Sequence, residues 1–279
     1  MKKTLLIGII SLISVLALQA QSRLAVWCHG VPTYYNISDV DSIVFENSVV
    51  PQYGQPCPGT PTLTDIDGNV YNTVQIGQQC WMKENLRTTK YADNTSISQG
   101  STTGDWYYPY NDASNKTTYG LLYNWKAVMR NSSSSSANPS GVQGICPTGW
   151  HVPSDAEWTQ LTDYVSSQSE YVCGSNNTYI AKALASDYGW QITADDVCAV
   201  GYDQSSNNVT GFSALPAGDY DGSYGSSGYG GFGYGTYFWS ATEYNDYYAY
   251  YRLLGSSGAH VDRGYYGENG GFSVRCLRD

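Results

Sequence analysis

The fold prediction starts from residues 146–158, Cys-Pro-Thr-Gly-Trp-His-Val-Pro-Ser-Asp-Ala-Glu-Trp, where the clearest helix of the chain begins. Ser154 can cap the first free N–H groups of that helix, and Glu157 stands three positions later, so the two residues form a capping box. Trp158, Leu161 and Val165 then recur on one side of the helix. This spacing predicts a helix that buries one face against a core.

Around this helix, the sequence predicts further helices in the middle of the chain and strands toward both ends. A helix is predicted over Tyr119–Met129, whose apolar residues fall on one helical face, and a shorter one around Tyr179–Leu184. Asp67-Gly68 is typical of a hairpin turn. The predicted strands cover residues 62–64, 70–76, 81–86, 237–240, 247–254, 259–262 and 272–277. The pattern indicates an α+β fold in which the N- and C-terminal strands close one sheet.

The N-terminus has the features of a secretory signal peptide. Met1-Lys2-Lys3 is basic, Leu5 to Leu18 is apolar, and Ala20 offers a cleavage site. The apolar run is too short to span a bilayer comfortably, and no other segment is apolar enough. We therefore predict a signal peptide over 1–20 and a secreted or cell-surface protein that does not insert into the membrane after cleavage.

Behind the signal peptide, we predict a strand leader and linker over residues 21–55 and one main domain over 56–279. Leu24–Trp27 and Ser42–Phe45 are expected to form a hairpin-like leader around a Gly30–Pro32 turn region. Residues 52–56 have a linker composition.

The composition argues against nucleic acid as a partner. The formal net charge is -10 and the pI is about 4.6, so the surface repels phosphate backbones. Only 14% of the residues are charged, and the polarity comes from Ser, Thr, Asn, Gly and 27 Tyr. Such a surface suits neutral ligands.

Seven cysteines are present: Cys28, Cys57, Cys80, Cys146, Cys173, Cys198 and Cys276. Export permits disulfides, and the odd number leaves one cysteine free or paired between chains. A zinc site needs closely spaced Cys or His residues, which the sequence lacks. The three histidines, His29, His151 and His260, are far apart in the sequence.

Several ordered blocks from Cys57 to Asp279 resemble the Fibrobacter succinogenes major paralogous domain family. The blocks include Asp65-Ile66-Asp67-Gly68-Asn69-Val70-Tyr71, Gln79-Cys80-Trp81-Met82, Cys146-Pro147-Thr148-Gly149-Trp150-His151-Val152-Pro153, Gly211-Phe212-Ser213-Ala214-Leu215-Pro216, Phe238-Trp239-Ser240-Ala241-Thr242-Glu243 and Ser273-Val274-Arg275-Cys276. The resemblance implies a Bacteroidetes-type extracytoplasmic domain with disulfides, and it implies no established activity.

A more distant resemblance concerns the fold. Residues 151–158 look like the helix-opening motif of formylglycine-generating-enzyme-like proteins, and residues 271–275 look like their closing strand. This similarity implies a C-type-lectin-like fold: a mixed sheet, two to three helices and long loops. In that fold a bridge joins the elements that carry Cys146 and Cys276. We then expect Cys173 to pair with Cys198 and Cys57 with Cys80, which leaves Cys28 over.

No catalytic constellation is visible, so we expect no enzyme, no cofactor and no catalytic metal. Cys276 is better explained as a disulfide partner, and no Gly-x-Ser-x-Gly elbow occurs. Carboxylate pairs such as Asp219 and Asp221 leave a hydrolase as a remote alternative. Residues 65–69 begin like a calcium loop, but Ile76 stands where the bidentate Glu is needed, so a hairpin is favoured and calcium stays possible.

Twelve of the tyrosines fall within residues 220–266. Tyrosine mixed with Ser, Gly and Asn is typical of binding surfaces, although the same rings could pack on their own domain. Alternation along Tyr247–Leu254 assigns Tyr248, Tyr250 and Arg252 to the exposed side. The predicted ligand-binding residues are Tyr244, Tyr247, Tyr248, Tyr250, Arg252, His260, Asp262 and Tyr265.

The sequence therefore favours a secreted binding module whose ligand is a carbohydrate or a surface protein. The alternative is a structural or assembly component of a surface filament. A further hypothesis is that residues 244–269 are hypervariable, as in the variable proteins of diversity-generating retroelements. The alternative is ordinary drift of surface residues in a tyrosine-rich family. The hypervariability hypothesis requires Tyr248, Tyr250 and Arg252 to lie exposed on one contiguous face.

Overall fold

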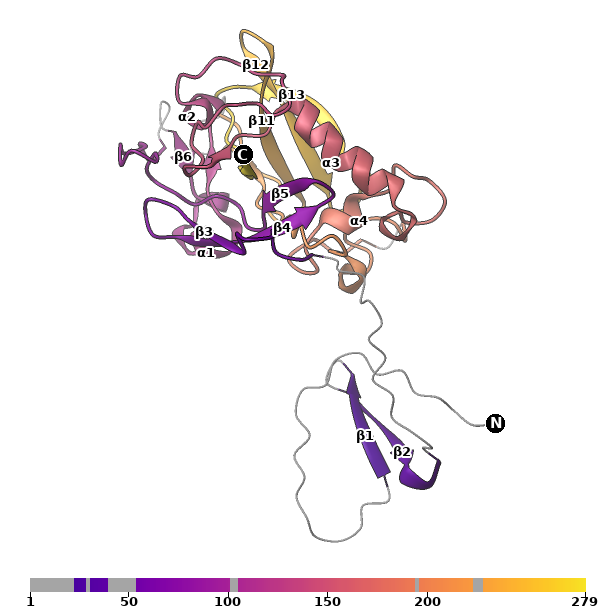
Figure 1. Cartoon of the computed structure of the whole chain (residues 1–279). Helices are drawn as coiled ribbons and strands as arrows, with labels where there is room; N and C mark the ends of the chain where they lie inside the picture. Colours follow the sequence, from indigo (N-terminus) through magenta and orange to yellow (C-terminus); the bar gives the residue numbers. More distant parts are fainter. Residues whose placement is uncertain (1–22, 29–30, 40–53, 101–104, 194–195, 223–227) are drawn as a thin grey trace. The chain divides into compact units, whose positions relative to one another are not determined.

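The computed structural model describes residues 23–28, 31–39, 54–100, 105–193, 196–222 and 228–279 (Figure 1). The chain divides between Gln52 and Tyr53 into two compact units. This boundary falls inside the segment predicted as a linker. The predicted signal peptide, residues 1–20, lies outside the described residues.

The described part of the first unit is a β-hairpin. Strand β1 (Arg23–Cys28) pairs antiparallel with β2 (Val31–Asn36), and the short 3₁₀ turn η1 (Ile37–Asp39) follows. Strand β2 begins at Val31, inside the region predicted as a turn. Residues 42–45, the predicted second strand of the leader, lie outside the described ranges.

The second unit is a mixed α+β domain with antiparallel sheets and few helices. Its strands in the described residues are β3 (Thr62–Thr64), β4 (Val70–Ile76), β5 (Gln79–Met82), β6 (Trp106–Tyr107), β7 (Leu122–Tyr123), β8 (Trp150–His151), β9 (Asp219–Tyr220), β10 (Tyr229–Gly230), β11 (Gly235–Asn245), β12 (Tyr248–Gly255), β13 (Asp262–Gly267) and β14 (Leu277–Arg278). The largest sheet has the order β3-β4-β5-β14-β8, and β11-β12-β13 form a second sheet. The last strand lies between early ones, so the termini of this unit close one sheet as predicted.

Several predicted strands differ in extent from those observed. The strand expected over 81–86 is β5 and ends at Met82, and the one expected over 259–262 begins at Asp262. Of the strand expected over 272–277, Phe272 and Ser273 make isolated bridges, and β14 begins only at Leu277. The predicted hairpin around Asp67-Gly68 is confirmed, since β3 pairs with β4. For these strands the type follows from the local pattern, whereas their ends depend on which neighbours the backbone meets.

The helices are α1 (Lys116–Tyr119), α2 (Trp125–Met129), α3 (Asp155–Ser167) and α4 (Ala181–Leu184), with 3₁₀ turns η2 (Pro109–Asn111), η3 (Ala113–Asn115), η4 (Ser169–Tyr171) and η5 (Gln204–Ser206). The predicted helix α3 is confirmed with its capping box: Ser154 Oγ accepts from the Glu157 N–H at 3.2 Å, and Glu157 Oε2 accepts from the Ser154 N–H at 2.9 Å.

The helix predicted over Tyr119–Met129 is wrong over its first half. Gly120 has φ +79° and ends α1, because this left-handed conformation cannot continue a helix. Leu122 and Tyr123 then pair with β6 as strand β7. Asn124 caps the five-residue helix α2, because the Asn124 side-chain oxygen accepts a hydrogen bond from the Ala127 N–H. Pairing with β6 outweighs the helical spacing of the apolar residues.

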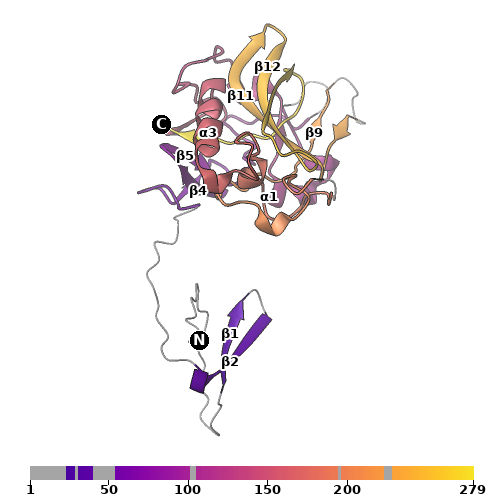
Figure 2. The same ribbon diagram turned by 90° about the vertical axis from the view of Figure 1, so that its right-hand side faces the viewer.

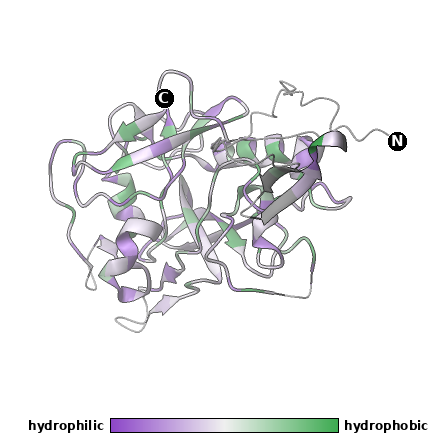
Figure 3. Cartoon of the chain, turned by 90° about the horizontal axis from the view of Figure 1, so that it is seen from below, coloured by the Kyte–Doolittle hydropathy of each residue, from purple (hydrophilic) through white to green (hydrophobic). Residues whose placement is uncertain are grey.

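Strand β11 lies between two hydrophobic clusters and contributes side chains to both. Phe238 packs against Trp158 of α3, with ring centroids 5.5 Å apart, and Trp239 packs against Phe272 on the other side at 4.3 Å. Helix α3 runs along the β11-β12-β13 sheet (Figure 1), and the β11–β12 hairpin end projects beyond it (Figure 2). Individual helices and strands contain both hydrophobic and hydrophilic residues, as the hydropathy colours of Figure 3 show. Part of this second sheet is therefore covered by the helix and part is open.

The three predicted disulfides are present. Cys57–Cys80, Cys146–Cys276 and Cys173–Cys198 have Cα–Cα separations of 5.7, 5.9 and 5.5 Å, which are ordinary for disulfides. The Cys146–Cys276 bridge spans 130 residues and ties the segment before β8 to the segment before β14.

Arg275, in the segment that leads into β14, is a charged residue in the core. Its guanidinium group is fully buried and donates to Asn85 Oδ1 and to the carbonyls of Met82, Phe212 and Ser213. Its guanidinium carbon also lies 4.6 Å from the centroid of the Phe212 ring. A buried charge needs such a set of acceptors, so Arg275 fixes the C-terminal segment against the end of β5, the residues that follow it and the 210–215 loop.

Candidate functional site

Four tyrosines form a connected aromatic surface on the open part of the β11-β12-β13 sheet. We call Tyr244, Tyr248, Tyr250 and Tyr265 the tyrosine patch. Tyr244 and Tyr265 stack with centroids 4.0 Å apart and an interplanar angle of 7°, and Tyr250 and Tyr248 meet this pair edge-on at 5.6 and 5.8 Å. Register explains the cluster, because Tyr250 stands opposite Tyr265 across β12 and β13. Four of the predicted binding residues are thus brought together.

Arg252 does not belong to this exposed surface, and its predicted exposure is wrong. It shares the sheet face of Tyr248 and Tyr250, but α3 covers that face from this point on, and Arg252 is only 3% exposed. Its guanidinium group donates to Asp155 Oδ1 at 2.6 Å and to Thr159 Oγ1 at 3.0 Å. Strand alternation gives the correct face but cannot show where a helix crosses it. The hypervariability hypothesis therefore lacks the contiguous exposed face that it requires.

An ion-pair network joins the tyrosine patch to the start of α3. Arg263 Nε donates to both carboxylate oxygens of Asp155 at 3.0 Å, and its guanidinium carbon lies 3.8 Å from the Tyr250 ring centroid. The pKa of Asp155 is lowered, because the hydrogen bonds and charges of Arg263 and Arg252 outweigh its burial. The network holds Tyr250 in place through a stacked cation.

The remaining predicted site residues lie at the other end of the strands. Asp262 stands opposite Leu253 in the β12–β13 register. It lies five positions along β13 from Gly267, the residue that stands opposite Tyr248 of the tyrosine patch. His260 is exposed and packs edge-on against Tyr179, with centroids 4.8 Å apart. The structure therefore does not bring His260 or Asp262 to the tyrosine patch.

A cavity of about 880 Å³ opens beside the tyrosine patch. We call it the β12–β13 cleft, because Asp246, Tyr247 and Tyr248 line it from the start of β12 and Tyr266, Gly267, Glu268 and Asn269 line it from the end of β13. Asp105, Asn124 and Lys126 come from the segments around β6 and α2. Tyr247 is 75% exposed and Tyr248 is 41% exposed, so the cleft has aromatic walls that face solvent.

The polar groups of this cleft include several without a partner in the protein. Within the described part of the chain, the side chains of Lys126, Asp246 and Glu268 make no hydrogen bond or ion pair. The pKa of Glu268 is raised by burial and by the charges of Glu243 and Asp246, against the opposing charge of Lys126. Polar groups that converge on a cavity without internal partners are available to a ligand.

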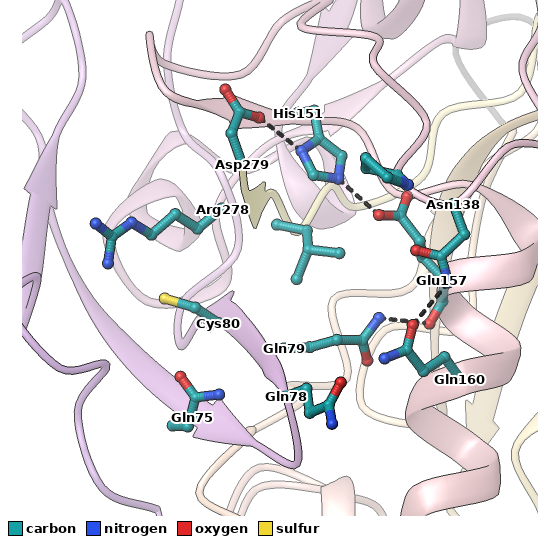
Figure 4. A pocket seen from close by; sticks show the side chains of 12 residues that line it. Gln75, Gln78, Gln79, Cys80, Asn138, His151, Glu157, Gln160, Arg278 and Asp279 are labelled. Carbon is teal, nitrogen blue, oxygen red and sulfur yellow. Dashed lines mark hydrogen bonds and ion pairs between the residues drawn. The ribbon is translucent and has the colours of Figure 1, made fainter.

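A second cavity, of about 360 Å³, surrounds His151 (Figure 4). His151 Nε2 lies 2.8 Å from Glu157 Oε1, and His151 Nδ1 lies 2.7 Å from Asp279 Oδ1. Burial opposes a charge on the imidazole, but the hydrogen bonds and charges of Glu157 and Asp279 outweigh it and raise the pKa of His151. The imidazole thus connects β8, α3 and the end of β14.

The polar groups around this second cavity are mostly occupied by one another. Glu157 Oε2 accepts from the N–H groups of Ser154 and Ser140, and Gln79 Nε2 donates to the Glu157 carbonyl. Asn138 Nδ2 donates to Gln160 Oε1, as Figure 4 shows. A network satisfied in this way stabilises the joint between elements and leaves little for a ligand. Sequence reasoning missed it, because His151, Glu157 and Asp279 come together only through the fold.

The acidic residues 65–69 serve the first hairpin. Asp65 accepts from the N–H groups of Asp67 and Asn69 and from the Tyr71 hydroxyl, which agrees with the predicted turn. In the ranges that the structure describes, no three His, Cys, Asp or Glu side chains gather as they would around a metal ion. No helix among those residues is long and apolar enough to cross a membrane.

Comparison with known proteins adds one finding. The model of the Fibrobacter succinogenes major domain (Fib_succ_major) matches residues 74–278, which include the β12–β13 cleft and, except for Asp279, the residues that line the cavity around His151. No curated protein and no solved structure matches the chain.

Proposed function

The chain belongs to the Fibrobacter succinogenes major domain family, and on this premise we propose that it is a non-catalytic extracytoplasmic module that binds carbohydrate in the β12–β13 cleft. One observation carries the proposal: a cavity of about 880 Å³ walled by the exposed rings of Tyr247 and Tyr248, into which polar groups without internal partners converge. The tyrosine patch continues this aromatic surface outside the cleft.

The chemistry of the cleft suits a sugar. A pyranose ring offers an apolar face to an aromatic ring and hydroxyl groups at its edge. Tyrosine combines a large ring with a polar tip, and it loses little rotamer freedom on binding. Carboxylates such as Glu268 accept hydrogen bonds from hydroxyls, and the Lys126 ammonium donates them. These side chains therefore complement both parts of a sugar.

The proposed location and fold type rest on separate support. An extracytoplasmic location agrees with the three disulfides and with the signal-peptide features of residues 1–20. We also propose that the domain is C-type-lectin-like. In its support, β14 pairs with β5 and β8 in one sheet, α3 follows β8, and the Cys146–Cys276 bridge joins the segments before β8 and β14.

A glycan array with the secreted full-length protein tests the proposal, followed by titration of the best glycan. Tyr248→Ala should weaken binding at least about tenfold, the effect of losing a central aromatic contact. Tyr202→Ala is the matched control, because Tyr202 is 45% exposed and lies outside the cleft. Equal affinities of both variants, or self-assembly of the protein without glycan binding, would contradict the proposal.

A further inference from the structure

The β12–β13 cleft has an uneven charge. Three carboxylates line it, from Asp105, Asp246 and Glu268, against the single ammonium group of Lys126. Asp105 accepts a hydrogen bond from the Ser98 hydroxyl at 2.7 Å, whereas the other two carboxylates have no hydrogen-bond donor among the described residues. Glu243, a neighbour that raises the pKa of Glu268, adds a further negative charge close by. The cleft therefore has an excess of negative charge.

We infer that the cleft selects a carbohydrate that carries a protonated amine, such as an oligomer of unacetylated amino sugars, over neutral and acidic glycans. This inference rests on the proposed function and names its ligand class. A sugar amine that enters the cleft meets the Asp246 and Glu268 carboxylates, which accept no side-chain hydrogen bond from the described residues, and it faces tyrosine rings whose negative faces attract cations. An acidic sugar meets the same carboxylates as like charges and is repelled.

Burial strengthens this selection. Glu268 is half-buried, and burial together with the charges of Glu243 and Asp246 raises its pKa against the opposing charge of Lys126. A cation beside it relieves the repulsion from Glu243 and Asp246. Tyr247, Tyr248 and Tyr266 line the same cavity, so the amine and the apolar face of the sugar ring find their partners in one site.

The test titrates the full protein with three probes of equal length at about pH 6, where sugar amines are protonated and galacturonate is ionised. The probes are an oligomer of glucosamine, the same oligomer fully N-acetylated, and an oligomer of galacturonate. We expect the glucosamine oligomer to bind about tenfold more tightly than its acetylated form, and the galacturonate oligomer to bind weakest. Added salt should reduce the difference.

Two variants with opposite expected effects separate charge from structural damage. Glu268→Gln should weaken binding of the glucosamine oligomer about three- to tenfold and weaken the acetylated oligomer clearly less, because only the amine loses an opposite charge. Lys126→Gln should strengthen binding of the glucosamine oligomer about two- to fivefold, which damage to the fold would not do. Glu170→Gln is the control, because it removes the same charge from η4, outside the cleft.

The outcomes distinguish the two proposals. If the neutral and amine-bearing oligomers bind equally well and both depend on Tyr248, carbohydrate binding stands and the charge selection is overturned. The selection is also overturned if the glucosamine oligomer is preferred but neither Glu268→Gln nor Lys126→Gln changes its affinity. If no oligomer or array glycan binds, both proposals are wrong.

Discussion

Replacing His151 by Gln should destabilise the domain in a pH-dependent way. The side chains of His151 and Glu157 are 3% and 2% exposed, and they meet at 2.8 Å. Gln has no charge, so the substitution leaves the buried Glu157 carboxylate without its cation. Removing one partner of a buried pair costs about 3–5 kcal/mol of unfolding free energy. The contact with Asp279 adds little, since the Asp279 side chain is 61% exposed.

The pH dependence follows from the raised pKa of His151. A histidine whose folded pKa lies above its usual 6.5 binds a proton more tightly in the folded state, so its stabilisation is full below pH 6.5. This stabilisation is lost as the pH rises through the folded pKa. The difference in unfolding free energy between the wild type and His151→Gln should therefore be about 3 kcal/mol at acidic pH and smaller at alkaline pH.

Urea unfolding at about pH 5.5 and about pH 9 measures this difference on either side of the transition. His260→Gln is the matched control, because His260 is exposed and packs edge-on against Tyr179 rather than against a carboxylate. It should unfold like the wild type at both pH values. A destabilisation by His151→Gln that is the same at both values would refute the reasoning, because the charge on the imidazole would then contribute nothing.

Two further predictions concern the framework around the cleft. Arg252→Met removes the buried partner of Asp155, while Arg263 still holds that carboxylate. The variant should therefore lower the unfolding free energy by about 3 kcal/mol in urea titrations and leave glycan affinity unchanged. A loss of affinity without a loss of stability would contradict the structural role of Arg252. The double variant Cys146→Ala, Cys276→Ala opens a loop of 130 residues and should lose about 4–5 kcal/mol in the chain-entropy model, measured by the same titration. A loss below about 1 kcal/mol would show that the bridge is dispensable.

The sequence predicted those parts of the fold that depend on local chemistry. The capping box of Ser154 and Glu157 placed the start of α3, and Asp67-Gly68 placed the first hairpin. The helix expected over 119–129 failed because Gly120 ends α1 and β6 takes Leu122 and Tyr123 into a strand. A spacing of apolar residues cannot show that a partner strand is available. The same limit applies to Arg252. Strand alternation predicted the correct sheet face for its side chain, but it could not predict that α3 covers this face at Arg252.

The candidate site was predictable only in its aromatic half. Tyr247, Tyr248 and their neighbours follow one another in a tyrosine-rich stretch, so composition identified them. Lys126 and Asp105 reach the cleft from segments more than 100 residues away in the sequence, and Glu268 resembles any surface carboxylate until the cleft is seen. Their role depends on tertiary contacts that no local pattern encodes.

The most direct test of carbohydrate binding in the β12–β13 cleft is an NMR titration of the labelled domain with its best glycan, read as backbone amide shift changes. We predict that the largest changes fall on residues 246–248 and 266–269, which line the cleft. Changes confined to residues that line the cavity around His151, such as Gln78, Gln79 and Asn138, would place the ligand elsewhere and contradict the account.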